Sequence, residues 1–177
     1  MQRRTYLASV AGLAATGGCL GTFSSALPDG GDGGPNAPAE CPSFDGSTAT
    51  VCVGDTDAAA SFSRSTATVS SGGEFVTTLT NESADEVGLN PYAWTLYRRD
   101  GDGWTQVAPD AFVEPWRSLD AGESVSWHLQ VGDAERTTGD DDVYVGPLDL
   151  ASGEYAFTVV PFVDGDRTEF VAPVVVE

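Results

Sequence analysis

From about residue 61 onward, apolar residues occupy every second position in short segments bounded by turn residues. Such a two-residue period is typical of strands with one buried face. In SVSWHLQV it predicts an apolar face of Val125, Trp127, Leu129 and Val131 and a polar face of Ser126, His128 and Gln130. In EFVTTLT, YAWTLY and EYAFTVV it predicts inward sets of Phe75, Thr77 and Leu79, of Tyr92, Trp94 and Leu96, and of Tyr155, Phe157 and Val159.

Helices are not expected in this part of the chain, because no segment beyond residue 40 keeps a 3.6-residue apolar spacing for ten residues. A half-buried sheet needs a second sheet over its apolar face, so the sequence predicts an all-β sandwich of about seven to nine strands. The alternation places Trp94 and Trp127 in the core and leaves the positions of Trp104 and Trp116 open.

The N-terminal segment follows a different pattern. Arg3 and Arg4 precede the apolar run Tyr6–Ala15, which small residues follow up to Gly18. The run is shorter than the roughly 20 apolar residues of a membrane span, and the order of these features is typical of an export signal over residues 1–18. RRTYLAS resembles the twin-arginine export motif, in which paired arginines precede an aromatic residue and a leucine.

Residues around Cys19 predict how the chain is held after export. ATGGC resembles the lipobox of lipoproteins, which implies that Cys19 is lipidated, becomes the new N-terminus and anchors the chain to the extracellular face of the cell membrane. Residues 19–40 are rich in Gly, Pro, Asp and Ala, a composition that predicts a disordered, flexible tether. Residues 41–177 then form one domain of common size.

Charge and cysteine content indicate in which surroundings the protein works and which partners it can bind. The chain has 27 acidic and 8 basic residues, no lysine and a net charge of −19, so nucleic acid is excluded as a partner by repulsion. This pattern resembles secreted proteins of extremely halophilic archaea, whose carboxylates are screened by salt. Once Cys19 is assigned to the anchor, Cys41 and Cys52 remain, and outside the membrane an even pair favours a disulfide over metal binding or redox chemistry.

Catalytic and metal centres are not expected. His128 is the only histidine and Met1 the only methionine, whereas a blue-copper site needs two histidines, a zinc site needs several His or Cys ligands, and a serine triad needs a histidine base beside an activated serine. Placed on the polar face, His128 is expected to be a solvated imidazole. The sequence therefore predicts no enzyme, no catalytic residue, no metal and no cofactor.

Three acidic segments and one sequon are weaker indications of calcium binding and of N-glycosylation. The segments DGDG (100–103), GDDD (139–142) and DGD (164–166) carry oxygen ligands suited to calcium, but Asp-Gly is also a favoured hairpin turn, and turn chemistry is the preferred interpretation. Asn81–Ser83 reads NES and satisfies the N-glycosylation sequon, which makes Asn81 a candidate acceptor at an exposed strand end.

The segment LASGEY suggests a more specific architecture. Tyr155 follows Leu150 and Gly153 at the spacing of a tyrosine corner, in which the hydroxyl bonds the backbone a few residues upstream, although Phe157 replaces the usual cysteine. With TLTNES, GDGWTQV and LDAGESVSWHL, it resembles the bacterial immunoglobulin-like domains of extracellular lipoproteins, over Ser61–Val176. The resemblance implies an immunoglobulin-like sandwich on the cell surface and leaves the ligand unspecified.

Two functions are consistent with these features. The first is a lipid-anchored, non-enzymatic module that binds or scaffolds envelope components, with an unidentified envelope protein or glycan as its partner. The second is an inhibitor of extracellular proteases, since some bacterial inhibitors resemble this layout, with a turn such as Ala121-Gly122-Glu123 before an aromatic strand.

Overall fold

The computed structural model of the chain describes residues 41–44, 47–56, 58–111, 113–133 and 142–177. All of them belong to one compact unit. The predicted signal with Arg3 and Arg4, the anchor Cys19 and the tether lie outside the described residues. Within the described ranges, no helix is long and apolar enough to cross a membrane.

The described residues form thirteen strands and no helix. The strands are β1 (Ala49–Cys52), β2 (Ala60–Arg64), β3 (Thr68–Val69), β4 (Glu74–Asn81), β5 (Val87–Leu89), β6 (Trp94–Asp100), β7 (Gly103–Ala108), β8 (Arg117–Leu119), β9 (Ser124–Val131), β10 (Val143–Leu148), β11 (Gly153–Val159), β12 (Phe162–Val163) and β13 (Asp166–Val176). The predicted all-β class is confirmed. The strand count exceeds the expected seven to nine because β3, β5, β8 and β12 are only two or three residues long.

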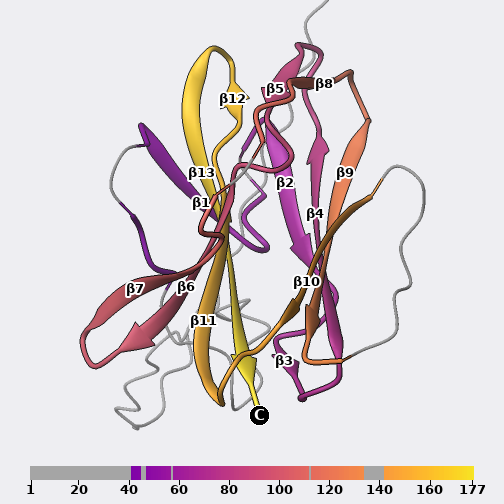
Figure 1. Cartoon of the computed structure of the whole chain (residues 1–177). Helices are drawn as coiled ribbons and strands as arrows, with labels where there is room; N and C mark the ends of the chain where they lie inside the picture. The colour runs from indigo at the N-terminus through magenta and orange to yellow at the C-terminus, as the bar shows by residue number, and fades with distance from the viewer. Residues whose placement is uncertain (1–40, 45–46, 57, 112, 134–141) are drawn as a thin grey trace, which may run out of the picture. The chain divides into compact units, whose positions relative to one another are not determined.

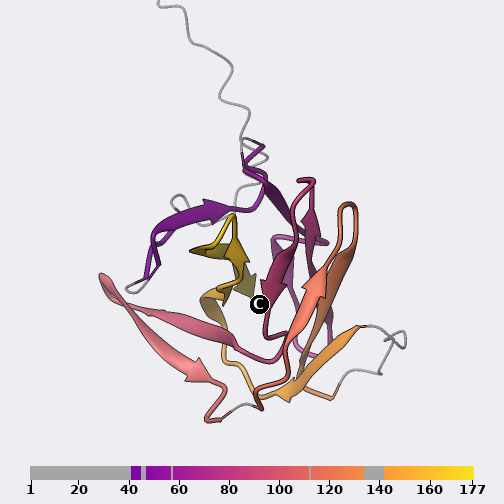
Figure 2. The ribbon, with the colours of Figure 1, turned by 90° about the horizontal axis from the view of Figure 1, so that it is seen from above.

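Two sheets make up the sandwich. The larger has nine strands in the order β7-β6-β11-β13-β12-β5-β8, with β1 and β3 also paired to β13. The smaller has the order β10-β9-β4-β2, and Figure 1 shows these four strands side by side across from β11 and β13. In the view from above (Figure 2), the β6–β7 hairpin extends away from the strands of the smaller sheet. Strands β7 and β8 therefore stand at opposite ends of the larger sheet.

Aromatic side chains from both sheets meet in the core. Trp127 on β9 lies 5.8 Å from Phe157 on β11, measured between ring centroids, and Phe62 on β2 lies 5.8 Å from Phe170 on β13. All four side chains are buried. Each pair joins the smaller sheet to the larger one, so the burial of these rings stabilises the contact between the two layers.

The alternation predicts the buried faces of β4 and β9 correctly and fails at three places. Phe75, Thr77 and Leu79 on β4, and Val125, Trp127, Leu129 and Val131 on β9, are all buried. Tyr92 was expected in the core but precedes β6 and is 42% exposed. Gln130 was expected on the polar face but is buried. Strand β11, which lies between β6 and β13 in the larger sheet, buries Ala156 and Thr158 as well as its predicted inward residues.

The tyrosine corner is present. The Tyr155 side chain is buried, and its hydroxyl donates a hydrogen bond of 2.7 Å to the carbonyl oxygen of Ala151. Burial raises the pKa of the Tyr155 hydroxyl, and the nearby Arg98 guanidinium partly opposes the rise. The contact fixes the start of β11 against the segment that leads into it, as the resemblance to immunoglobulin-like domains implies.

The segment before β1 is fastened to the outer surface of the larger sheet. Cys41 and Cys52 form the predicted disulfide, with their Cα atoms 6.2 Å apart. Inside the closed loop, the Phe44 ring stacks on Tyr97 of β6 with centroids 3.8 Å apart. The Phe44 amide also donates a hydrogen bond of 3.0 Å to Glu169 Oε2 on β13. This segment therefore covers part of β6 and β13.

Covering Glu169 changes its acidity. Burial raises the pKa of the Glu169 carboxyl above its ordinary value of 4.5, and hydrogen bonds from the Phe44 amide and the Thr50 hydroxyl oppose the rise in part. In the pH range between the unfolded and the raised pKa, the native state therefore holds more protons than the unfolded state. The contribution of Glu169 to the free energy of unfolding is full below the unfolded pKa and is lost as pH rises through the raised pKa.

Glu169→Gln is expected to remove this pH dependence, because a neutral amide keeps an oxygen that can accept both hydrogen bonds. Between pH 4 and pH 7, the native protein should lose unfolding free energy relative to the Glu169→Gln variant. Chemical denaturation at both pH values measures it, and Glu154→Gln at an exposed position of β11 controls for the change in net charge. An equal difference at both pH values would contradict the expectation.

Candidate functional site

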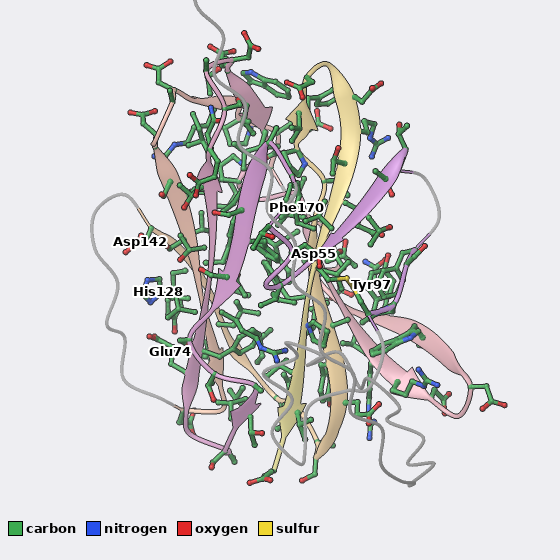
Figure 3. All side chains as sticks on the ribbon, turned by 180° about the vertical axis from the view of Figure 1, so that it is seen from behind. Asp55, Glu74, Tyr97, His128, Asp142 and Phe170 are labelled. Atoms are coloured by element: carbon green, nitrogen blue, oxygen red, sulfur yellow. A yellow bond between two sulfur atoms is a disulfide. The ribbon has the colours of Figure 1, made fainter. Side chains whose placement is uncertain are left out.

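His128 lies between two carboxylates on the outer face of the smaller sheet. Its Nδ1 atom is 3.1 Å from Glu74 Oε1 on β4, and its Nε2 atom is 3.2 Å from Asp142 Oδ2, just before β10. Figure 3 shows the three side chains together. The side chain of His128 is only 13% exposed, so the expectation of a solvated imidazole is wrong. Sequence reasoning missed the contact with Glu74 because that residue lies 54 positions away along the chain and is brought to His128 only by the pairing of β4 with β9.

The geometry at His128 fits a structural role. Both ring nitrogens face carboxylates, whereas the hydroxyl of Ser126, on the same strand face, pairs with Thr78 Oγ1 at 2.9 Å. The imidazole therefore links β4, through Glu74, to the residue just before β10. Asp142 leads directly into β10, where Tyr144 pairs with His128 in parallel register. His128 thus ties the start of an edge strand to its neighbour.

His128→Ala is expected to lower the free energy of unfolding by about 1–2 kcal/mol, because it removes both contacts of the largely buried imidazole with carboxylates. Denaturation measures the loss, and hydrogen exchange should show earlier opening of β10 than of β4. Ser126→Ala, on the same face of β9, is the matched control and should change stability less. Equal stability of His128→Ala and the native protein would refute the bridge.

The predicted acceptor Asn81 is not available for glycosylation in the folded chain. It is 0% exposed, and its Nδ2 atom donates hydrogen bonds to the carbonyl oxygens of Asp85 and Leu119, at 2.7 and 2.9 Å. A glycan on Nδ2 would replace one of these two hydrogens and would have to fit where no space is exposed. The expected exposed strand end is therefore wrong, and Asn81 acts as a buried brace.

The acidic segments lie in turns where the structure describes them. Gly101 has a positive φ of 59° between β6 and β7, and Asp164 has one of 53° between β12 and β13. Of GDDD, only Asp142 lies within the described residues. Among the described residues, no group of three or more His, Cys, Asp or Glu side chains is arranged to hold a metal ion.

A hollow near the disulfide offers little for catalysis. It is lined by Val51, Gly54, Asp55, Thr56 and Ala58. Asp55 is the only titratable residue among the described lining residues, and its Oδ2 atom accepts a hydrogen bond of 2.7 Å from the amide of Cys52. Within the part of the chain that the structure describes, the lining therefore brings no second titratable group to Asp55 for acid–base chemistry.

The larger sheet presents an aromatic pair at the edge formed by β12, β5 and β8. Trp116 is 62% exposed and Phe162 is 40% exposed, and their ring centroids are 5.8 Å apart with an interplanar angle of 53°. The Trp116 ring lies directly on Gly88, where a Cβ atom would overlap its Cζ2 atom. Sequence reasoning left Trp116 open, because the residues before β8 have no apolar alternation.

Polar side chains share the face with this pair. Strand register aligns Ser118, Gly88, Phe162 and Arg167 in one row across β8, β5, β12 and β13, and residues paired across strands point to the same side of a sheet. Arg167 is exposed and its guanidinium has no hydrogen-bond or ion-pair partner among the described residues. We call Trp116, Phe162, Ser118 and Arg167 the aromatic face.

The other arginines that the structure describes have hydrogen-bond partners for their side chains. Each of them donates a side-chain hydrogen bond to a backbone carbonyl: Arg64, Arg98, Arg99 and Arg117. In a chain with a net charge of −19, an exposed guanidinium that remains uncommitted is available to a ligand.

Comparisons with known proteins do not extend this picture. A scan against known protein families finds no family that matches the chain, and a search of curated proteins finds no similar one.

Proposed function

We propose that this chain is a non-enzymatic binding module of the cell envelope, held at the extracellular face of the membrane through lipidated Cys19, and that it binds other envelope components through the aromatic face. The observation that carries the proposal is the exposure of Trp116 beside Phe162. Large exposed aromatic side chains are unusual on soluble proteins and gather where partners bind.

The position of the aromatic face supports the same function. Phe162 lies on β12, and the Trp116 ring packs on Gly88 of β5 beside it, so the two rings are held in place before a partner arrives. Such preorganisation reduces the ordering cost of binding. The bridge at His128 offers no activated nucleophile, since the neighbouring Ser126 hydroxyl pairs with Thr78, and this favours binding without turnover.

The alternative of a protease inhibitor receives less support. The turn containing Ala121-Gly122-Glu123 is tied to the fold: the Gly122 amide donates to the Asn81 carbonyl oxygen at 2.8 Å, and Glu123 Oε2 accepts from the Asp120 amide at 2.9 Å. A tight, internally bonded turn does not offer the extended segment that a protease cleft accepts. Unchanged activity of the cell's own secreted proteases with excess protein would remove this alternative.

The binding function is tested with envelope fractions of the producing cells. The full chain is expected to bind them saturably without releasing any product, and Trp116→Ala should weaken binding at least tenfold. Val107→Ala is the matched control, because Val107 is also exposed (42%) but lies on β7 at the other end of the sheet. Absence of binding, or equal loss in both variants, would refute the proposal.

A further inference from the structure

We propose that the ligand of the aromatic face is a neutral glycan. This inference rests on the binding function proposed above and adds the chemical class of the partner. It is carried by three features that occur together on one sheet face: a pair of exposed rings, an uncommitted guanidinium, and carboxylates at the rim.

The rings supply a surface for the apolar side of a sugar. A pyranose ring presents C–H groups on its faces, and these pack against aromatic rings, whose faces carry partial negative charge. The Trp116 ring rests on Gly88, so it stays against the strand and its other side is open. Phe162 lies beside it at an interplanar angle of 53°. Two rings held at an angle form a shallow cradle that fits consecutive sugar units better than a flat peptide backbone.

The rim supplies both kinds of hydrogen-bonding group. Arg167 follows Phe162 in the row across the strands, and Ser118 stands on the other side of Gly88. Glu86 and Asp120 are exposed and lie just beyond the paired residues Val87 and Leu119, at one end of the same short strands. Sugar hydroxyls both donate and accept, so a rim with a guanidinium, a hydroxyl and carboxylates can satisfy them.

Charge separates a neutral glycan from other ligands. An anionic polysaccharide would meet Glu86 and Asp120 as well as the field of a chain with net charge −19. A cationic peptide would meet the exposed guanidinium of Arg167 beside the rings. Like charges brought together at an interface are costly. A neutral polyhydroxyl ligand carries no charge and therefore encounters neither repulsion.

Treatment of the envelope fractions distinguishes this inference from the binding function itself. Periodate cleaves vicinal diols of sugars, and a protease removes protein partners. We expect the full chain to lose binding at least tenfold after periodate and to keep it after protease. Loss after protease with survival after periodate would overturn the glycan inference and leave the binding function standing, whereas no binding to untreated fractions would overturn both.

Competition and variants test the chemistry of the ligand. Glycans released from the envelope and separated by anion exchange should compete when neutral, and stronger competition by the acidic fraction would overturn neutrality. Arg167→Gln should weaken binding about fivefold or more, whereas Arg99→Gln, which makes the same change on β6, should not. Gly88→Ala keeps both rings but displaces the Trp116 ring from Gly88, so it should weaken binding. Unaltered binding of that variant would contradict the proposed arrangement of the two rings. Near-UV circular dichroism verifies folding of each variant.

Discussion

Replacing Asn81 with alanine is expected to lower the free energy of unfolding by about 3–4 kcal/mol, because one buried and three partly buried hydrogen bonds are lost at once. The Asn81 amide donates to the carbonyl oxygens of Asp85 and Leu119, and its Oδ1 atom accepts from both the amide and the hydroxyl of Ser83, at 2.9 and 2.8 Å. These contacts join the end of β4 to the loop before β5 and to the end of β8. Chemical denaturation measures the change.

Asn90→Ala is the matched control for this loss. Asn90 also uses both ends of its side chain, donating to the Val113 carbonyl oxygen at 2.8 Å and accepting from the Tyr92 amide at 2.9 Å. Those contacts are exposed, so water can replace the lost partner and the cost should be about 1 kcal/mol or less. A loss at Asn81 no larger than that at Asn90 would show that Asn81 is not a structural brace.

The contrast at Asn81 illustrates what sequence patterns predict and what they miss. A two-residue period reports which side chains of a strand face the core, and it placed Phe75, Leu79 and Trp127 correctly. It cannot report where a polar residue at a strand end finds carbonyl partners. Those partners come from residues 4 and 38 positions away. The sequon therefore suggested an exposed acceptor where the fold places a buried one.

The candidate site was harder to predict for the same physical reason. Trp116 lies outside any alternating segment, and its neighbours Gly88 and Phe162 are brought to it only by the pairing of β5 with β8 and β12. The contact of His128 with Glu74 also depends on strand pairing, because the two residues lie 54 positions apart on β9 and β4. Local features fared better: the tyrosine corner and the pairing of Cys41 with Cys52 each involve residues close in sequence, and both are confirmed.

Trp127→Ala is expected to cost about 3–5 kcal/mol of unfolding free energy, the range for removal of a large buried aromatic side chain. Trp127 is 0% exposed and contacts Phe157 across the two sheets. Its Nε1 atom donates a hydrogen bond of 2.7 Å to the Pro91 carbonyl oxygen. Trp127→Phe should retain much of the packing and lose that bond, so a smaller loss of about 1–2 kcal/mol is expected.

Trp116→Ala supplies the matched control, since it removes the same side chain from a position that is 62% exposed. We expect it to change the unfolding free energy by less than about 1 kcal/mol, although it should abolish most binding to envelope fractions. Trp127 would then contribute mainly to stability and Trp116 mainly to binding. A large stability loss in Trp116→Ala would mean that the ring mainly shields Gly88 and β5, and the aromatic face would lose its main support as a binding surface.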